Sequence, residues 1–310
     1  MLTTPILLLI FNRPEPTAKV FETIRKARPK QLFVAADGPR LHKEGEFKKC
    51  EAARKIATNV DWDCEVKTLF RNENKGCGIA VSEAITWFFE EVEQGIILED
   101  DILPDNSFFK FCDELLEKYK DDPAVMTIGG YKRLDSTFTT SESYFFTGYP
   151  ISWGWATWRR AWKNYDFTIA SWASKKQQKL IRQNYSKAQF LYFKDVFDMV
   201  CNKNEIDTWD FQWLYCIVAN KGMGIVPAVN LVKNIGYGAD ATHTFIASED
   251  ITNTIVSEIS FPLIQPNKKS INKAYDKQMA KKHFSKPLIA ERISNKLKHI
   301  IQRFSKRQGK

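Results

Sequence analysis

The chain has 310 residues, 44% of them hydrophobic, which is enough to fill the core of one large domain or two smaller ones. The formal net charge of +9 is unevenly distributed, because residues 268–310 alone carry a net charge of +12 and residues 1–267 carry −3. The composition excludes a disordered chain, and the acidic balance of residues 1–267 disfavours a nucleic-acid-binding groove in that part.

Six cysteines occur without a Cys-x-x-Cys pair or a zinc-like spacing, and we interpret them as reduced core residues of a cytoplasmic protein. The apolar run 5–11 has no preceding basic stretch and no small-residue cleavage site. It is also too short to span a bilayer. We therefore expect it to form the first strand.

The first part of the chain alternates between strand-like and helix-like segments. The expected strands are 5–11, 31–37, 64–70 and 96–98, and the expected helices are 20–27, 47–57, 79–93 and 108–119. Strands separated by helices are joined by right-handed crossovers. The sequence therefore predicts an α/β fold with a mostly parallel sheet flanked by helices.

The pattern changes after residue 125. The expected elements there are short strands at 125–128 and 144–147, a Trp-rich segment at 152–158 without an assigned structure, a polar helical region at 173–204, an apolar helix ending at 219, and a turn and strand over 222–232. We expect a main domain over 1–267, with halves at 1–125 and 126–267, and a basic helical tail over 268–310.

Three consecutive acids, Glu99, Asp100 and Asp101, follow the apolar run 96–98 directly. A buried parallel strand of this kind opens into the crevice where α/β sheets bind ligands. Adjacent carboxylates disfavour each other's ionised form, and a hard divalent cation such as Mn²⁺ or Mg²⁺ would relieve the repulsion while recruiting phosphates. The alternative is a solvated corner between strand and loop.

Asp37 ends the second expected strand and should share the same sheet edge as the three acids, although Asp37-Gly38-Pro39 is also a turn signal. The chain contains neither Gly-x-Gly-x-x-Gly after the first strand nor Gly-Lys-Ser/Thr, which disfavours dinucleotide and P-loop sites. A site that binds a diphosphate through a metal ion is still compatible with the sequence.

The segment 97–102, with Pro104-Asp105 and a Phe-Phe helix after it, resembles the metal-binding segment of GT-A fold nucleotide-sugar glycosyltransferases, among them N-acetylglucosaminyltransferase I and its bacterial relatives. The resemblance covers about residues 4–245 and is weaker after the helix. It implies a GT-A, Rossmann-like domain over 1–267, with a nucleotide-binding half at 1–125 and an acceptor and catalytic half at 126–267.

The resemblance also implies roles on the donor side. Asp101 would contact the metal on the donor diphosphate, and Asp100, with Glu99 beside it, would lie near the ribose or the donor sugar. Asp37 would contact the base. Arg13, after the first strand, would contact the nucleotide.

The family's catalytic base lies in a Trp-Asp segment that here reads Trp209-Asp210. Phe211-Gln212 stands where the relative has a second acid, so Asp207 remains an alternative to Asp210, and Asp210 could instead cap a helix. His243, in the Gly-rich loop 234–244, is either a further metal ligand or a loop histidine bonded to backbone.

Together these features favour a metal-dependent inverting glycosyltransferase that uses a nucleotide-sugar donor, expected to be a UDP-sugar, and a glycan or glycolipid acceptor. Trp153 and Trp155 are candidates for stacking on sugar rings. One alternative is a sugar nucleotidyltransferase on a similar fold. The other is a non-enzymatic protein that binds membranes or nucleic acid through its basic tail.

The tail contains apolar residues at helical spacing over 288–304 among many basic residues. An amphipathic basic helix of this kind binds anionic membrane surfaces. The sequence therefore predicts a peripheral association with the inner face of the cytoplasmic membrane. The alternative is a solvated helix that docks on the main domain.

Overall fold

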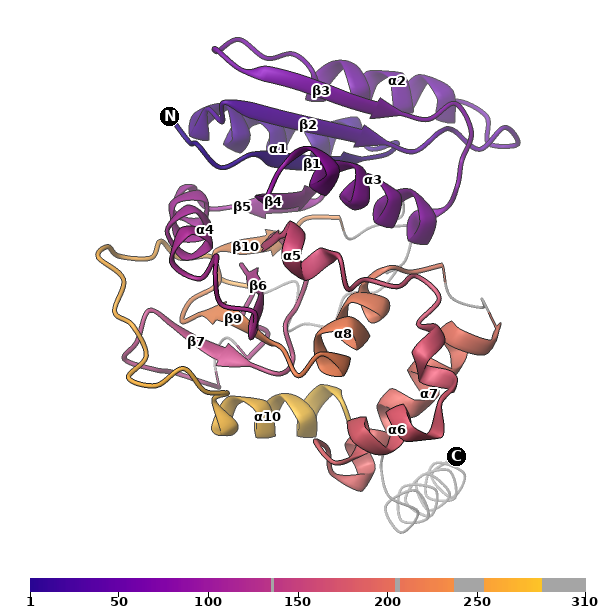
Figure 1. Ribbon diagram of the computed structural model, residues 1–310. Helices are drawn as coiled ribbons and strands as arrows, with labels where there is room; N and C mark the ends of the chain where they lie inside the picture. The colour runs from indigo at the N-terminus through magenta and orange to yellow at the C-terminus, as the bar shows by residue number, and fades with distance from the viewer. Residues whose placement is uncertain (135–136, 204–206, 237–253, 286–310) are drawn as a thin grey trace, which may run out of the picture.

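The computed structural model describes residues 1–310 except 135–136, 204–206, 237–253 and 286–310. It is a mixed α/β fold built on an eight-stranded sheet of order β3-β2-β1-β4-β8-β6-β9-β7 (Figure 1). Strands β3, β2, β1 and β4 are parallel neighbours, and β6 and β9 are parallel as well, so parallel pairs predominate. This confirms the expected α/β fold with a mostly parallel, Rossmann-like sheet.

The elements of the first part agree with the sequence pattern to within a few residues, except that the first helix starts well before its expected bound and that the short strand over residues 102–104 was not expected. They are β1 (Ile6–Ile10), α1 (Pro14–Ala27), β2 (Gln31–Ala36), α2 (Glu46–Ala57), β3 (Glu65–Phe70), α3 (Cys77–Glu91), β4 (Gln94–Glu99), β5 (Ile102–Pro104) and α4 (Asn106–Lys118). Proline at the first position of α1 suits a helix start because its missing N–H has no partner there anyway. Asp105 caps α4 by accepting the N–H of Ser107.

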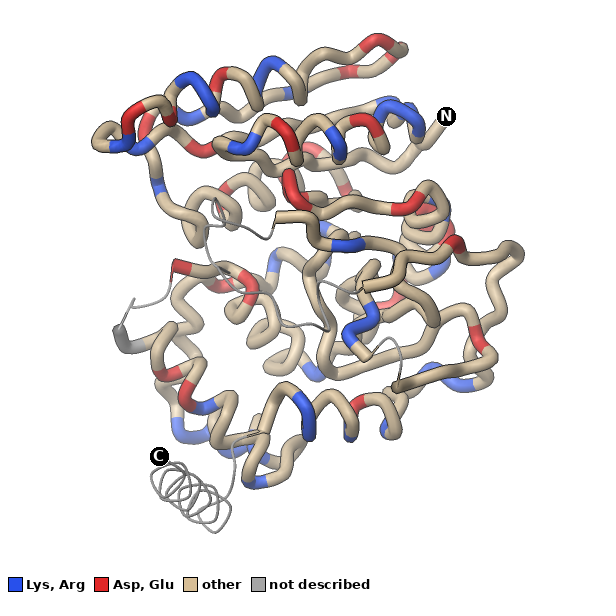
Figure 2. The backbone as a smooth tube through the Cα atoms, turned by 180° about the vertical axis from the view of Figure 1, so that it is seen from behind, with Lys and Arg blue, Asp and Glu red and all other residues tan. Residues whose placement is uncertain are grey.

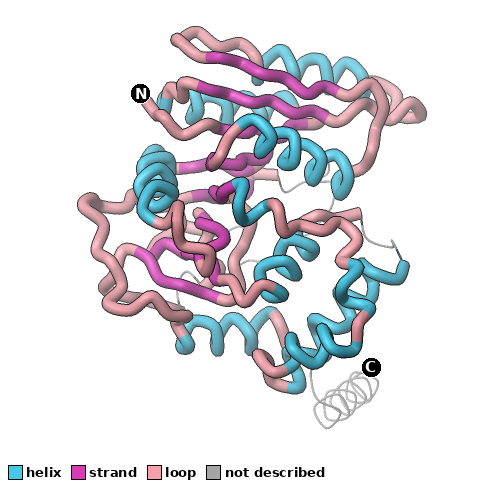
Figure 3. Tube along the Cα trace, in the orientation of Figure 1, coloured by secondary structure: helices cyan, strands magenta, loops and turns pink. Residues whose placement is uncertain are grey.

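Alternate residues of β1 face two different cores. Ile6, Leu8 and Ile10 pack with α1, α2 and α4 on one face of the sheet. Leu7 and Leu9 pack on the other face with α3, α5 (Arg159–Trp162) and α8 (Asp210–Ala219). Figure 3 shows these helices on both sides of the strands. Burial on both faces explains why β1 and β4 read as continuous apolar runs.

The second part contains β6 (Val125–Gly129), β7 (Tyr144–Thr147), β8 (Trp155–Trp158), β9 (Met223–Pro227) and β10 (Val232–Asn234). The Trp-rich segment left unassigned by the sequence pattern is strand β8, which pairs antiparallel with both β4 and β6. Its side chains are buried on both faces, so it lacks the alternation that marks a half-exposed strand. Strand β10 pairs antiparallel with β5 and brings residues 234–236 beside the acidic triplet.

A third, aromatic-rich cluster joins η1 (Ala170–Ala173), α6 (Lys175–Arg182), α7 (Lys187–Lys203) and α8 to α10 (Lys273–His283). Tyr275 and Met279 of α10 are fully buried in this cluster. Asp276 accepts the hydroxyl of Thr147 and the N–H of Gly148 at 2.9 Å, at the end of β7. Packing is therefore continuous across the boundary expected at 267/268, and the amphipathic segment 288–304 lies outside the described residues.

Charged residues lie mainly along the helices and loops, whereas most strand positions are uncharged (Figure 2). All six cysteines are free. Within the described ranges, no helix has the length and apolar character needed to cross a membrane.

Candidate functional site

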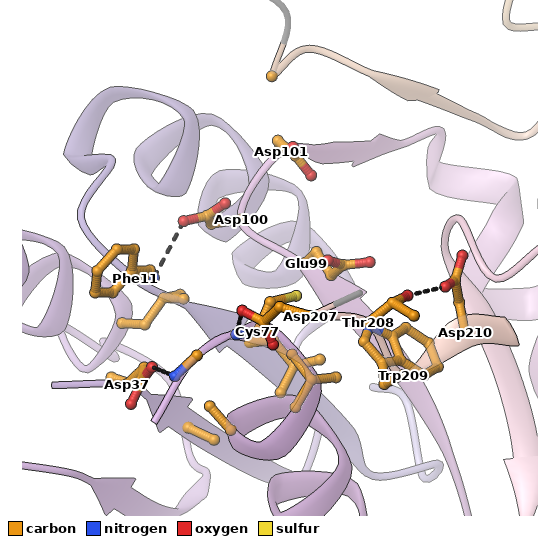
Figure 4. Close-up of a pocket in the computed structure, with 18 of the residues that line it drawn as sticks. Phe11, Asp37, Cys77, Glu99, Asp100, Asp101, Asp207, Thr208, Trp209 and Asp210 are labelled. Atoms are coloured by element: carbon orange, nitrogen blue, oxygen red, sulfur yellow. Dashed lines mark hydrogen bonds between the residues drawn. The ribbon is translucent and has the colours of Figure 1, made fainter. Parts of the chain in front are cut away.

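A cavity of about 550 Å³ lies at the carboxyl ends of β1, β2 and β4. The chain runs β1, β2, β3 in one direction from β1 and then places β4 on its other side, so the sheet changes direction between β1 and β4. Open α/β sheets bind ligands at such a switch point because the loops from the two neighbouring strands diverge there. Glu99, Asp100, Asp101 and Asp37 all line this cavity, as their positions at strand ends predict (Figure 4).

The three acids of the triplet differ in their surroundings. Asp100 is 2% exposed and accepts the N–H of Phe11 at 3.2 Å, and Asp101 accepts the N–H of Ile235 with its backbone carbonyl at 2.8 Å. The carboxylate of Glu99 points toward Asp210 and makes no hydrogen bond within the described part of the chain (Figure 4). One acid is thus fixed to β1, one to the loop after β10, and one is available to the cavity.

Arg13, in the loop between β1 and α1, lies between two of these acids. Its guanidinium donates to Asp101 at 3.0 Å and to Asp100. Burial lowers the pKa of Arg13, but Asp100 and Asp101 raise that pKa by more, so the side chain stays a cation. Arg13 therefore supplies a fixed positive charge at the place where the sequence predicts a nucleotide contact.

One arginine does not neutralise the whole triplet. Burial first, and then repulsion from Asp101 and Asp100, raises the pKa of Glu99 to about 8. Burial also raises the pKa of Asp100 to about 6, although Arg13 opposes this shift. The cavity is thus more acidic than its cations can balance: its acids are Asp37, Glu99, Asp100, Asp101, Asp207 and Asp210, and its arginines are Arg13, Arg40 and Arg71.

The carboxylate of Asp37 is bound to the loop that precedes α3. It accepts the backbone N–H groups of Lys75 and Gly76 at 3.0–3.1 Å and the side-chain amide of Asn74 at 2.9 Å. Burial raises its pKa, and the N–H groups of Lys75, Gly38 and Gly76 oppose the rise. Asp37 lines the cavity while it holds this loop, and its contact with a base stays a prediction.

Asp210 is the first residue of α8 and lies across the cavity from the triplet (Figure 4). One of its carboxylate oxygens accepts the hydroxyl of Thr208 and the N–H of Phe211 at 2.9 Å. The other oxygen has no hydrogen bond among the described residues. Asp207, the alternative base, has both oxygens occupied by the N–H groups of Cys77 and Gly78, at 2.8 and 2.6 Å.

Other cavity residues had no role in the sequence prediction. Arg40 pairs with Glu46 and lies 5.4 Å from the centre of the Phe11 ring. Arg71 follows β3 and pairs with Glu83 at 3.0 Å. Their position after strands was the only sequence signal, because the parallel strands β1 to β4 all end at the same edge of the sheet.

Cys77, at the start of α3, also lines the cavity. Burial, followed by the negative charge of Glu99, raises the pKa of its thiol well above the usual range. A raised pKa favours the neutral thiol, whereas reactive cysteines have lowered pKa values.

Of the two tryptophans predicted to stack on sugar rings, Trp153 lines the cavity and packs on Tyr131 with ring centres 4.7 Å apart. The prediction for Trp155 was wrong. Its side chain is 1% exposed and packs against Trp209 and Trp213 in the core. As a residue of the central strand β8, Trp155 is covered by α8 and cannot reach a ligand.

The donor atoms near Asp101 suit a cation that arrives with its substrate. Among the described residues, no group of three or more His, Cys, Asp or Glu side chains could hold a metal ion by itself. Mg²⁺-type sites commonly need only one or two carboxylates, because substrate phosphates and water complete the coordination. Asp101 keeps one oxygen outside its Arg13 contact, and Glu99 is near, so the residues fit this kind of site.

The loop expected to cover a ligand is described only at its start, where Asn234 and Gly236 line the cavity. A Cβ at Gly236 would lie 2.1 Å from a carboxylate oxygen of Asp101 and 2.7 Å from the Arg13 guanidinium. Glycine is therefore required for the loop to approach the triplet this closely. His243 lies outside the described residues, so its role as a metal ligand stays a prediction.

No protein-family model and no curated protein sequence matches the chain. Among solved structures, a UDP-glucose pyrophosphorylase complexed with UDP-glucose is 10% identical and aligns over 73% of this chain and 90% of its own, with a TM-score of 0.35. The inositol-1-phosphate CTP transferase from T. maritima is 9% identical over 73% and 86%, with a TM-score of 0.38. HddC from Yersinia pseudotuberculosis is 12% identical over 53% and 80%, with a TM-score of 0.32. Similarity at this level leaves the function to be argued from the site.

Proposed function

We propose that the chain is a metal-dependent inverting glycosyltransferase that moves a sugar from a nucleotide-diphosphate donor to a hydroxyl of a glycan or glycolipid. The arrangement that supports this best is the acidic end of β4, with Arg13 beside it, facing Asp210 across one cavity. The first group suits a charged leaving group and the second suits proton transfer. A UDP-sugar is the expected donor.

On the donor side, the chain offers a charged end and an aromatic end. The Arg13 guanidinium would donate to a phosphate oxygen while it keeps its contact with Asp100. Phe11, with Arg40 over its ring, and Asn74 lie at the end toward β2 and would border the base and ribose. Glu99 would face the sugar, because its carboxylate points toward Asp210 (Figure 4).

A divalent cation, when bound to Asp101 and Glu99, would neutralise the charge that builds on the leaving diphosphate. Without it, a cavity with this excess of acids would repel a diphosphate. The chain's own cation at this point, Arg13, pairs with Asp100 and Asp101 and would therefore offset only part of this charge.

In the reaction, the acceptor hydroxyl oxygen forms a bond to the anomeric carbon as the bond from that carbon to the diphosphate oxygen breaks. The electron pair leaves with the nucleoside diphosphate, and the hydroxyl proton passes to Asp210. Attack from the face opposite the leaving group inverts the anomeric centre. A positioned base contributes about 10² to 10⁴ in rate, since a free hydroxyl is a weak nucleophile at neutral pH.

A sugar nucleotidyltransferase is the second candidate, and the position of Arg13 favours it. A cation in the loop after β1 is where a nucleoside triphosphate would need charge neutralisation. In that reaction a sugar-phosphate oxygen attacks the α-phosphorus and pyrophosphate leaves, so no base is needed at Asp210.

Binding comes first in the test. Full-length protein is heated with UDP, UDP-glucose or UDP-N-acetylglucosamine, each with Mn²⁺, Mg²⁺ or EDTA. A donor at 100 times its dissociation constant should add about 2.7 kcal/mol to the free energy of unfolding, and only when the metal is present. Equal stabilisation in EDTA would contradict the metal-dependent site.

Product analysis then separates the two candidates. A glycosyltransferase releases UDP from a UDP-sugar, by slow hydrolysis even when the acceptor is absent. A nucleotidyltransferase releases pyrophosphate from UTP and a sugar 1-phosphate. Pyrophosphate release without UDP release would replace the first candidate by the second.

A further inference from the structure

We propose that Asp207 is a positioning residue, which joins the start of α3 to the segment before α8 and so sets the place of the Asp210 carboxylate. The inference rests on the proposed function, in which Asp210 takes the acceptor proton. It assigns Asp207 a role other than that of a catalytic base, which the sequence left open for this residue.

The first observation is the occupancy of the Asp207 carboxylate. One oxygen accepts the N–H of Cys77 at 2.8 Å, and the other accepts the N–H of Gly78 at 2.6 Å. These are the first two N–H groups of α3, whose own N-cap residue, Gly76, has no side chain to satisfy them. Both oxygens of the Asp207 carboxylate are thus bound to the start of α3, a contact that holds the two segments together.

The second observation is a close backbone approach that allows these bonds. A Cβ at Gly78 would lie 2.7 Å from the carbonyl oxygen of Thr208, and a Cβ at Gly76 would lie 2.8 Å from Asp207. Gly76 also has a φ of +82°, which disfavours any other residue. Segment 76–78 and segment 207–208, about 130 residues apart in the chain, are therefore in backbone contact.

The third observation connects this contact to Asp210. The hydroxyl of Thr208 donates to Asp210, and the side-chain amide of Gln212 donates to the Thr208 carbonyl at 2.7 Å. The residue next to Asp207 thus orients the carboxylate across from the triplet. Loosening Asp207 would move Thr208 and misplace Asp210 relative to the anomeric carbon.

The same loop is held from its other side. Asp37 accepts the N–H groups of Lys75 and Gly76, so residues 75–78 lie between an acid on the nucleotide side and an acid on the acceptor side. Residues 75–78 therefore connect the segment before Asp210 to the sheet edge where the triplet lies. Holding this loop in place is a physical reason for the cavity to contain two acids, Asp37 and Asp207, that bind backbone N–H groups.

The test uses Asp207→Asn, which keeps the size of the side chain but replaces one acceptor oxygen by an NH₂ group that faces an N–H donor. We expect kcat to fall by roughly 10- to 100-fold, as displacement of a reacting group by about 1 Å does, with KM for the donor nearly unchanged. Asp166→Asn is the matched control. Asp166 accepts the N–H groups of Thr168 and Ala170 at 2.9 and 2.8 Å, and it is not among the cavity-lining residues.

The double variant Asp207→Asn/Asp210→Asn decides between positioning and independent action. If Asp207 acts through Asp210, the double variant is no slower than Asp210→Asn alone. Losses that multiply would overturn the proposal, and so would a kcat of Asp207→Asn equal to that of the wild type. Loss of turnover in Asp207→Asn with full activity in Asp210→Asn would make Asp207 the base.

Hydrogen–deuterium exchange tests the same contact without any reaction. This test therefore stays valid even if the proposed function is wrong. In Asp207→Asn, peptides that cover 74–80 and 208–213 should both exchange faster, while peptides of β1 and α4 keep their wild-type rates. Faster exchange of 74–80 alone would show that Asp207 only caps α3, and it would overturn the proposal.

Discussion

The acids at the end of β4 and the acid at the start of α8 reach the same cavity, but the molecule holds them in different ways. Glu99, Asp100 and Asp101 lie at the end of β4, whose residues Ile96–Leu98 are fully buried. This strand has one parallel neighbour, β1, and one antiparallel neighbour, β8. Asp210 follows a loop whose position depends on side-chain contacts with α3. The first group is placed by the sheet, and the second by the packing of Trp209 and Trp213 in the core together with hydrogen bonds of the segment before α8.

This difference predicts different sensitivities. A change in the triplet should affect ligand binding, because the sheet keeps the rest of the site in place. A change near α8 should affect turnover, because binding does not need the acceptor side to be aligned. The four changes below can separate or contradict these two behaviours.

The largest effect is expected from Asp210→Asn. The amide keeps the size of the side chain and one acceptor oxygen but cannot take a proton, so UDP-sugar turnover should fall by at least about a hundredfold. Donor affinity, measured by calorimetry with Mn²⁺, should stay within about twofold of the wild type. Full turnover in this variant would remove Asp210 from the mechanism and leave it as part of the helix start.

Asp101→Asn should show the opposite behaviour. Loss of groups that merely support metal ligands costs roughly 10- to 100-fold in metal affinity, so loss of a proposed ligand should weaken Mn²⁺-dependent UDP binding by at least about tenfold. The fold should remain, because Asp101 lies at the strand mouth outside the core. Asp121→Asn, on the surface turn after α4, is the control. An unfolded Asp101→Asn protein would instead indicate a structural role for the triplet.

Gly236→Ala tests the loop that lies against the triplet. The added methyl would overlap the Asp101 carboxylate and the Arg13 guanidinium, so both must shift. We expect UDP binding to weaken by roughly tenfold, which corresponds to an overpacking cost of about 1.4 kcal/mol. Gly45→Ala is the comparison, since a Cβ there meets nothing within 4 Å and strains only the backbone. Equal losses of UDP binding in the two variants would mean that the change reflects reduced stability and not the contact with the triplet.

The smallest effect concerns Asp276, which lies far from the triplet and is held in the aromatic cluster. Burial raises its pKa to about 6, against opposing bonds from Thr147 and Gly148. Between pH 3.8 and 6 the folded state then binds a proton that the unfolded state has released, so the free energy of unfolding falls as pH rises, by up to about 1.4 kcal/mol per pH unit.

Urea unfolding at several pH values in that window measures this slope directly. Asp276→Asn cannot titrate, so its slope should be flatter than that of the wild type, whatever its absolute stability. Donor binding at pH 7 should not change, since Asp276 is not among the residues that line the cavity. Identical slopes in the two proteins would contradict the raised pKa.

Much of the donor side could be predicted from the sequence alone. Apolar runs such as 5–11 and 96–98 identify buried strands, and helices between strands require parallel crossovers. Parallel strands place all their carboxyl ends at one edge, so Asp37 and the triplet had to share a cavity whatever the loops do. That prediction depends on local hydrophobic periodicity and on the right-handed crossover between parallel strands.

The acceptor side was decided by tertiary structure. Strand β8 is buried on both faces and short, so no periodicity marked it, and only its pairing with β4 and β6 shows that Trp155 belongs to the core. The different hydrogen bonding of Asp207 and Asp210 depends on contacts of Asp207 with α3, about 130 residues earlier in the chain. The sequence names acids that could serve as a base, but only the packing of one segment on another determines which carboxylate has both oxygens bound to backbone N–H groups and which has one oxygen without a hydrogen bond among the described residues.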